Sequence, residues 1–224
     1  MTDRTLFASL RAAAGTLAVL TAIALPASTL FAQSQDAPGP KAIALGSSAP
    51  KADVKMKGVD GKEVTIAQAA GKKGTLVVFS CNACPWVKKW EDRIAALGNE
   101  YSKKGVGVII INSNDPAKNA EDGYDVMVTR AKSKKFAFPY VVDATSDVAR
   151  AFGASRTPEV FLFDAQGKLV YHGAVDDNAD NAKAVKDAYL DNALASVVSG
   201  KPVTLAETKS MGCTIKFRGA KAAS

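Results

Sequence analysis

The feature that most limits how this chain can fold is a pair of cysteines placed between an apolar strand and a helix. Residues 75–79, Thr-Leu-Val-Val-Phe, form a run that is too short for a helix and apolar on both faces, which predicts a central strand of a parallel sheet. From Pro85 to about Tyr101, apolar residues recur at helical spacing. Proline suits a first helical turn because no amide donor is lost there. Cys81 and Cys84 therefore fall where the predicted strand ends and the predicted helix begins.

A cysteine at the start of a helix is suited to thiol–disulfide exchange. The helix dipole and the free amides of the first turn stabilise a thiolate and lower its pKa. We expect Cys81 to lie exposed at the helix N-terminus as the nucleophile, and Cys84 to be more buried and mostly protonated. Cys81 would attack a disulfide, and Cys84 would resolve the mixed disulfide to leave an oxidised Cys81–Cys84 pair. The reverse reaction would donate a disulfide, so the direction depends on the redox potential of the couple.

Two other roles fit the spacing of the cysteine pair less well. A structural disulfide across two intervening residues closes a tight, strained loop and stabilises the fold little. A zinc site needs a full set of ligands, and besides the pair the chain offers only Cys213 and His172 as further cysteine or histidine ligands. The sequence therefore favours a redox role.

The remaining segments alternate between strand and helix patterns. Their order, which is strand, helix, strand, helix, antiparallel hairpin and closing helix, predicts an α/β protein with a thioredoxin-like fold, in which helices flank a mixed central sheet. An N-terminal hairpin extension precedes this unit and a C-terminal tail follows it. The further predicted elements are a hairpin at 54–56 and 63–66, a turn or short helix at 67–74, a strand at 105–112, a helix at 123–136, an extended segment at 139–143, a short helix at 146–152, a hairpin of strands 159–163 and 168–172, and a final helix at 181–198.

The N-terminal segment has the pattern of a secretory signal peptide. Two arginines precede an apolar run at residues 12–25, and proline and small residues follow it. We expect cleavage after Ala32, or nearer Ala24 or Ala27, and hence a periplasmic or secreted protein. The alternative is a membrane anchor formed by residues 12–32, since that stretch has about the length that a membrane crossing needs.

The chain thus divides into four predicted parts. They are a signal peptide (1–32), a flexible leader rich in Ser, Pro, Gly and Ala (33–49), a thioredoxin-like domain (50–200) and a C-terminal tail (201–224).

The chain is basic, with a formal net charge of +7, but its lysines are spread in short pairs without aromatic residues between them. This pattern predicts a solvated surface rather than a nucleic-acid interface. Membrane contact is expected only if the N-terminal segment is retained. We expect no bound cofactor.

Thr157-Pro158 is the second element of the predicted site. In a thioredoxin-like fold the proline before the hairpin strand forms a cis peptide bond, lies against the redox pair and presents the backbone of the preceding residue to an extended substrate. Elsewhere an X-Pro bond is normally trans, so this prediction depends on the fold. Arg156 could raise the local positive potential and favour a thiolate, or could be a solvated surface residue. Trp86, at the start of the predicted helix, is a further candidate for substrate contact.

Together these residues resemble the thioredoxin-like proteins of the AhpC/TSA (redoxin) superfamily, in a bacterial subgroup with a Cys-x-x-Cys-Pro motif. The resemblance covers about residues 45–218. It implies a thioredoxin fold, Cys81 and Cys84 as the redox pair, and Pro158 as a cis proline. The segments that carry it are Phe79 to Lys88 (FSCNACPWVK), Asn112 to Asp115 (NSND), Arg156 to Asp164 (RTPEVFLFD) and Gly212 to Lys216 (GCTIK).

The sequence departs from two patterns found among such proteins. The Pro-x-x-x-Thr-x-x-Cys signature of peroxiredoxins is absent before either cysteine of the pair, and the Trp-Cys-Gly-Pro-Cys of thioredoxin is replaced by Ser-Cys-Asn-Ala-Cys. The leading prediction is an exported thiol–disulfide oxidoreductase that acts on protein disulfides or dithiols and exchanges electrons with a redox partner. A thiol-dependent peroxidase of AhpC/TSA type, with antioxidant activity, is the alternative.

One cysteine and the single histidine remain. Cys213 either packs as a buried free thiol or acts as a third redox thiol that exchanges with the pair. Copper-delivery proteins of the same fold bind their metal with two cysteines and a distant histidine, so Cys81, Cys84 and His172 could form a soft copper site. Those proteins have three residues between the cysteines and this chain has two. A lone histidine on a strand is more often structural.

Overall fold

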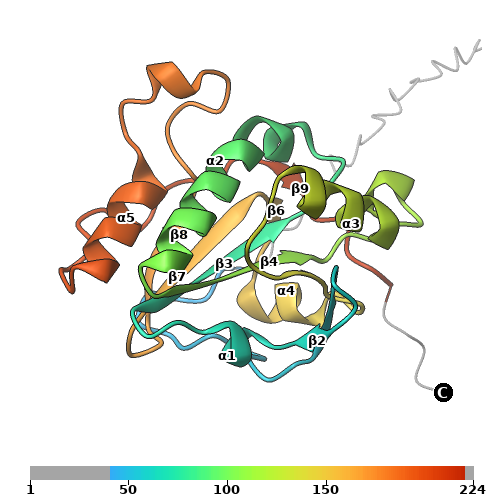
Figure 1. Cartoon of the computed structure of the whole chain (residues 1–224), viewed down its shortest axis with the longest axis horizontal. Coiled ribbons are helices and arrows are strands. Elements are labelled where there is room, and N and C mark those ends of the chain that lie inside the picture. Colours follow the sequence, from blue (N-terminus) through green and yellow to red (C-terminus); the bar gives the residue numbers. More distant parts are fainter. Residues whose placement is uncertain (1–40, 220–224) are drawn as a thin grey trace, which may run out of the picture. The chain divides into compact units, whose positions relative to one another are not determined.

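A seven-stranded mixed sheet forms the centre of the computed structural model, which describes residues 41–219 (Figure 1). Its strand order is β2-β1-β5-β4-β3-β7-β8. β3 runs parallel to β4 and antiparallel to β7, and β4 is parallel to β5. The predicted α/β fold with a mixed sheet is therefore confirmed. The strands of this sheet are β1 (Met56–Gly58), β2 (Glu63–Val64), β3 (Gly74–Ser80), β4 (Val106–Asn112), β5 (Tyr140–Val142), β7 (Glu159–Asp164) and β8 (Leu169–Gly173).

Helices cover both faces of the sheet. The side chains of β3 alternate, so that Leu76 and Val78 pack in one apolar layer and Val77 and Phe79 in the other. The first layer includes α2, α3 and α5, and the second includes α1 and α4; Figure 1 shows α2 and α5 side by side. Because both faces are covered, β3 is apolar on both sides. The helices are α1 (Ile66–Ala69), α2 (Pro85–Lys103), α3 (Tyr124–Ser133), α4 (Asp147–Phe152) and α5 (Tyr189–Val198), with 3-10 turns η1 (Ala120–Asp122) and η2 (Ala182–Ala184).

The final helix is shorter than its sequence pattern predicted. A helix at 181–198 was expected, but α5 begins only at Tyr189. Asn181 instead caps the short turn η2 with its side chain. The amide of Lys186 donates to the Asp177 carboxylate at 3.0 Å. These local bonds satisfy the backbone outside a helix and so compete with helix formation.

The segment before the sheet is attached to the domain. The amide of Ile43 donates to the Phe152 carbonyl oxygen at 3.0 Å, and the amide of Leu169 donates to the Ser47 carbonyl oxygen at 2.9 Å. These bonds tie residues 41–49 to α4 and β8. The expectation of a flexible leader is wrong for this stretch, because its backbone groups find partners on the folded domain.

The C-terminal segment is also part of the domain. β9 (Cys213–Thr214) pairs antiparallel with β6 (Arg156–Thr157) in a second, two-stranded sheet, so these sequence-distant segments lie side by side (Figure 1). Ile215 is 3% exposed and packs in the same apolar layer as α4. Its amide donates to the Ser155 carbonyl oxygen at 2.9 Å. The domain therefore continues beyond the predicted boundary at residue 200.

Two predictions concern the N-terminal segment. The signal peptide at residues 1–32 and the alternative anchor at 12–32 lie outside the described residues, as do residues 33–40 of the leader. Among residues 41–219, no helix combines the length and the apolar character that crossing a membrane requires.

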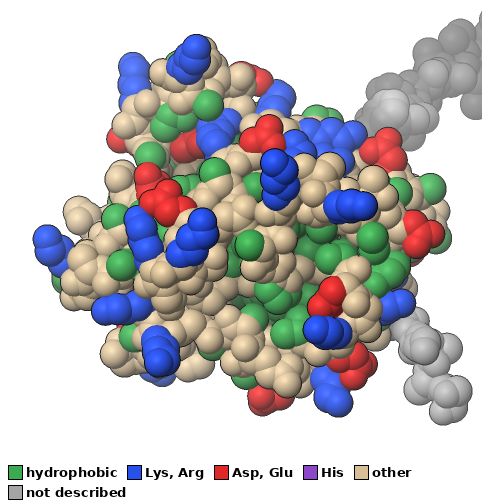
Figure 2. Space-filling model, viewed as in Figure 1, with side chains coloured by type: hydrophobic (Ala, Val, Ile, Leu, Met, Phe, Trp, Pro, Cys, Tyr) green, Lys and Arg blue, Asp and Glu red, His purple; other side chains and the backbone are tan. Residues whose placement is uncertain are grey.

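Charged side chains of both signs are mixed on the surface. On the face shown in Figure 2, Lys and Arg side chains lie among Asp and Glu. Exposed ion pairs include Lys88–Glu121 at 3.0 Å and Lys89–Asp180 at 2.6 Å. This face is consistent with the solvated surface that the sequence predicted.

Candidate redox site

The two cysteines of the motif lie between β3 and α2, and the helix starts directly after the second one. Cys84 has extended backbone dihedrals (φ −66°, ψ 123°), and Pro85 is the first helical residue; proline disfavours helical dihedrals in the residue before it. Cys81 is 1% exposed and Cys84 is 3% exposed. The expectation of an exposed Cys81 at the helix N-terminus is therefore wrong. Cys84 holds that position, and both cysteines are buried.

A buried carboxylate binds the amides of the loop between the cysteines. Asp122 Oδ1 accepts hydrogen bonds from the amide of Asn82 at 2.7 Å and from that of Ala83 at 2.9 Å. Its Oδ2 accepts one from the Asn114 side chain at 2.9 Å. These two loop amides therefore bind a carboxylate and not a Cys81 thiolate. Asp122 was not predicted, because one acidic residue far from the cysteines in sequence gives no spacing signal.

The side chain of Asn82 fixes the same loop. It is fully buried, and its Oδ1 accepts a hydrogen bond from the Tyr140 hydroxyl at 2.8 Å. Its Nδ2 donates to the Glu121 carbonyl oxygen at 2.8 Å. Each end of the Asn82 amide group thus has a partner, which holds the loop in one conformation.

Both sulfurs of the motif converge on Thr157. The Thr157–Pro158 peptide bond is cis, as predicted. Cys81 Sγ lies 3.3 Å from Thr157 Oγ1, and Cys84 Sγ donates to the Thr157 carbonyl oxygen at 3.1 Å. The β3–β7 register pairs the end of β3 with Glu159, which brings the cis proline next to the motif.

Cys213 joins the other two cysteines. β9 places it directly opposite Thr157, and it packs against the buried cluster that contains Cys81 and Cys84. The backbone edge of Thr157, which was expected to be open to an extended substrate, is instead paired with β9 because the C-terminal segment folds back onto it.

The surroundings of the two motif cysteines shift their pKa values in opposite directions. The thiol of Cys81 is the main cause that lowers the pKa of Cys84, and the Cys213 thiol and the amides of Val87 and Cys213 act in the same direction, against the effect of burial. The pKa of Cys81 is raised by its hydrogen bond to Cys84, by burial and by the Asp122 carboxylate. Burial and Cys84 also raise the pKa of Cys213. The expected order, with a thiolate at Cys81 and a thiol at Cys84, is reversed.

The two residues predicted as further substrate contacts lie beside the cysteines. Trp86 is half-buried, packs against the cysteine cluster and stacks on Trp90 with ring centroids 5.8 Å apart. Arg156 is exposed, and its guanidinium donates to Thr214 Oγ1 at 3.3 Å. Arg156 therefore holds β9, whereas Trp86 forms part of the surroundings of the sulfurs.

His172 contacts Glu159 and Phe161 and not the cysteine pair. Its Nε2 lies 2.8 Å from Glu159 Oε1, and its ring packs on Phe161 with centroids 4.6 Å apart. Glu159 Oε2 accepts the amides of Ser155 and Arg156 at 2.8 Å each. Within residues 41–219, no group of three or more His, Cys, Asp and Glu side chains is arranged to hold a metal ion. The structure therefore does not bring His172 to the cysteines as the copper hypothesis requires, because the histidine supports the loop before Pro158.

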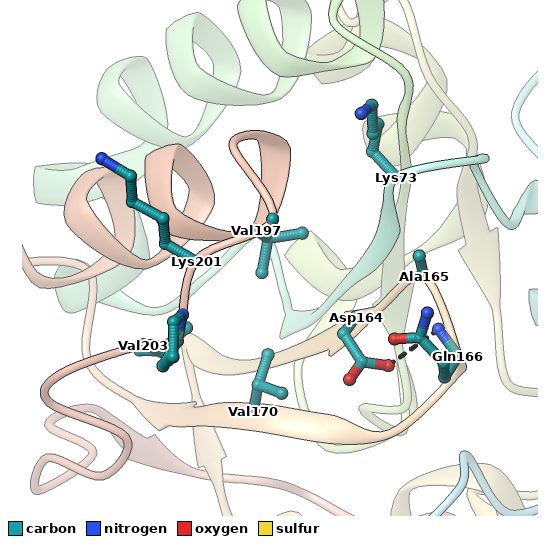
Figure 3. Close-up of a pocket in the computed structure, with 10 residues that line it drawn as sticks. Lys73, Asp164, Ala165, Gln166, Val170, Val197, Lys201 and Val203 are labelled. Carbon is teal, nitrogen blue, oxygen red and sulfur yellow. Dashed lines mark hydrogen bonds between the residues drawn. The ribbon is translucent and has the colours of Figure 1, made fainter.

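A separate cavity of about 370 Å³ lies at the other end of β3 (Figure 3). Val197 from α5 and Val170 from β8 point into it. The strand register pairs Gly74, at the start of β3, with Asp164, which also lines this cavity. None of its lining residues is a cysteine, so it is not part of the redox site.

Comparison with known proteins identifies the family of this chain. The family model described as Redoxin matches residues 44–190, which is more than half of the chain. The chain belongs to the redoxin family. Its resemblance to thioredoxin-like AhpC/TSA proteins is thus confirmed, and so is the prediction that it is an oxidoreductase.

Relatives of this redoxin include both named and uncharacterised proteins. The thiol-disulfide oxidoreductase ResA of Geobacillus thermodenitrificans is 29% identical over 57% of this chain and 68% of its own length. A hypothetical protein from Sinorhizobium meliloti has a solved structure that covers 80% of this chain and 97% of its own, with a TM-score of 0.73 and 35% identity. An uncharacterised conserved protein from Geobacillus kaustophilus covers 80% of this chain and 94% of its own, with the same TM-score and identity.

Proposed function

We propose that this redoxin is a thiol–disulfide oxidoreductase in which Cys81 and Cys84 form the redox couple and protein disulfides or dithiols are the substrates. The observation that carries this proposal is the convergence of both sulfurs on Thr157, beside a cis proline and directly after a central strand. The activity named for the relative ResA supports the same class of reaction.

In this proposal Cys84 is the group that attacks. A thiolate is the reactive form of cysteine, and the donors around Cys84 favour it there. The Cys84 thiolate attacks one sulfur of a disulfide, which forms a mixed disulfide and releases the first thiolate. Cys81 then attacks Cys84 Sγ, which forms the Cys81–Cys84 disulfide and releases the second. Two electrons pass to the substrate, whose two thiolates take up one proton from the Cys81 thiol and one from solvent, and the reverse sequence oxidises a dithiol.

The proposal includes export from the cytoplasm. Its support is the order of basic, apolar and small residues in positions 1–32. A dithiol–disulfide couple outside the cytoplasm acts on proteins whose disulfides are stable there.

A redox titration tests this function. The full chain is equilibrated in glutathione buffers of graded potential, quenched with acid, alkylated and mapped by mass spectrometry. We expect a single reversible two-electron transition in which Cys81 and Cys84 exchange between dithiol and disulfide. Cys81→Ser should remove that disulfide. A wild-type chain in which these two cysteines never become linked would contradict the proposal.

A further inference from the structure

Cys84 has two neighbouring cysteines, Cys81 and Cys213. It lies in one buried cluster with Cys81, and Cys213 packs against that cluster. Its sulfur also lies 3.1 Å from the carbonyl oxygen of Thr157, the residue that faces Cys213 across the β6–β9 pair. Disulfide formation needs two cysteines that are already close. Cys84 therefore has two potential disulfide partners, one on the motif and one on β9.

Access from solvent differs among the three cysteines. Cys81 and Cys84 are 1% and 3% exposed, whereas Cys213 is half-buried. Thiol–disulfide exchange requires the incoming sulfur to reach the sulfur that it attacks. A sulfur on another protein therefore meets Cys213 more readily than either cysteine of the motif.

The segment that carries Cys213 is held on both sides, so it does not behave as a removable cover. After it, Ile215 is 3% exposed and donates its amide to the Ser155 carbonyl oxygen at 2.9 Å. Before it, Gly212 approaches β6 so closely that an added Cβ would lie 2.3 Å from the Thr157 carbonyl oxygen. These contacts favour a fixed third thiol over a strap that must detach before the pair can react.

We propose that Cys213 is the thiol that forms the mixed disulfide with the substrate, and that Cys84 passes the disulfide between Cys213 and Cys81. This inference rests on the proposed function: it keeps the Cys81–Cys84 couple, but replaces the direct attack of Cys84 on the substrate with exchange through Cys213. The substrate class is a protein dithiol or disulfide whose sulfur can reach the molecular surface at β9.

The exchange balances without a further oxidant. In the direction of substrate oxidation, Cys213 attacks Cys84 Sγ of the Cys81–Cys84 disulfide, so that a Cys84–Cys213 disulfide forms and Cys81 takes up a proton. A substrate thiolate then attacks Cys213 Sγ, and Cys84 leaves. The second substrate thiolate attacks the substrate sulfur of the mixed disulfide and releases Cys213, which is protonated. Two electrons move from the substrate to the Cys81–Cys84 pair, and the reverse sequence reduces a substrate disulfide.

The donors around Cys84 support attack at Cys213. In a Cys84–Cys213 disulfide, attack at Cys213 makes Cys84 the leaving group. A thiol with a lower pKa leaves faster, and the hydrogen bonds that Cys84 accepts lower its pKa. Solvent access and the lower pKa of the leaving thiol therefore both favour attack at Cys213 Sγ.

The first test uses the full-length Cys81→Ser variant, oxidised with diamide and mapped without reduction. We expect a disulfide between Cys84 and Cys213; recovery of both cysteines unlinked would overturn the relay. Circular dichroism checks that the variant folds. If the variant does not fold, the oxidised wild type is used instead. It is quenched with acid during its reaction with reduced insulin chains. A transient Cys84–Cys213 disulfide is then the expected result, and its absence the contrary one.

The second test identifies the sulfur that meets the substrate. The reduced Cys84→Ser variant lacks the relay residue, so a mixed disulfide with its substrate cannot be resolved by Cys84. After incubation with insulin, we expect an insulin-linked adduct on Cys213. An adduct on Cys81 in its place would contradict the proposed route.

The third test separates this inference from the proposed function. Cys213→Ser keeps a hydrogen-bond donor beside Cys84 and removes only the third sulfur. Because a relay changes the rate and not the end state, the Cys81–Cys84 disulfide should still form at equilibrium in glutathione buffers. The rate of exchange with insulin should fall by about tenfold or more, as expected when a reacting group is no longer in place. An unchanged rate would overturn the relay alone, whereas a wild type without a reversible Cys81–Cys84 couple would overturn the proposed function.

Discussion

The amide of Ala83 donates a hydrogen bond to Asp122 Oδ1 at 2.9 Å, inside the loop that joins the two cysteines of the motif. A backbone donor that could stabilise a thiolate is thereby turned toward a carboxylate. The negative charge of Asp122 raises the pKa of Cys81, while other donors gather at Cys84. The local electrostatics therefore differ at the two ends of one short loop, and the pKa values of Cys81 and Cys84 shift in opposite directions.

Replacing Asp122 by asparagine should change both reactivity and stability. Asp122→Asn removes a negative charge near Cys81, so we expect the pKa of Cys81 to fall toward its ordinary value. An amide nitrogen in place of Oδ2 cannot accept the hydrogen bond from Asn114. The free energy of unfolding should therefore fall by about 1–3 kcal/mol. Ultraviolet absorbance of the thiolate across pH and urea unfolding measure the two effects.

Asp115→Asn is the matched control for this change. Asp115 accepts a hydrogen bond from the nearby amide of Ala117 at 3.0 Å and is not among the groups that shift the pKa of Cys81. It should leave the thiolate titration unchanged. Equal shifts in the two variants, or none in Asp122→Asn, would contradict the electrostatic role of Asp122.

The elements that were predicted correctly are those with local signals. Residues 75–79 are apolar on both faces because both faces of β3 are covered, and Pro85 marks the start of α2 because it needs no amide partner. The cis bond before Pro158 is different, since its prediction came from the expected fold and not from the dipeptide itself.

The parts of the site that were missed depend on contacts between distant segments. β9 has only two residues, too few for any periodic pattern, and its pairing with Thr157 appears only in three dimensions. The reversed pKa order likewise depends on donors from Val87 and Cys213, whose approach to Cys84 the spacing of two cysteines cannot reveal.

The shifted thiol pKa values predict how the stability of the reduced protein depends on pH. The pKa of folded Cys84 lies below that of an unfolded thiol, about 8.5, so its stabilising contribution is present above that pH and is lost as the pH falls through the folded value. The raised pKa of Cys81 acts in the opposite sense: its contribution is present below about 8.5 and is lost as the pH rises. The combined contribution of these two thiols to stability should therefore be greatest at about pH 8.5.

Urea unfolding of the reduced protein at a series of pH values measures this dependence. Reduced Cys84→Ser lacks the titrating group and is the comparison. The stability of wild type relative to this variant should decrease as the pH is lowered. A difference between the two proteins that is constant across pH would show that Cys84 does not carry the charge.

His172 should matter for stability and not for metal binding. In His172→Gln the pair with Glu159 at 2.8 Å is disturbed, and Glu159 is only 2% exposed. The free energy of unfolding should fall by about 1–3 kcal/mol. Copper(I) affinity, measured by competition with a chromophoric chelator, should be the same in wild type and variant. A loss of affinity on changing His172 would restore the copper hypothesis.

Peroxide reduction should be slow. Cys84, the cysteine that carries the charge, is 3% exposed, so hydrogen peroxide has little access to it. We expect hydrogen peroxide consumption with dithiothreitol to be no faster with wild type than with the Cys81→Ser/Cys84→Ser double variant. Turnover clearly above that background would favour the peroxidase alternative.

The C-terminal segment should contribute to stability although it follows the last helix. Ile215 is 3% exposed and packs in the apolar layer of α4, so Ile215→Ala should cost about 2–5 kcal/mol. Met211 precedes β9 and is 44% exposed, so Met211→Ala should change stability by no more than about 0.5 kcal/mol. Urea unfolding of the oxidised proteins compares them. Equal, small effects would mean that the segment is not part of the core, and the fixed position of Cys213 on which the relay depends would lose its support.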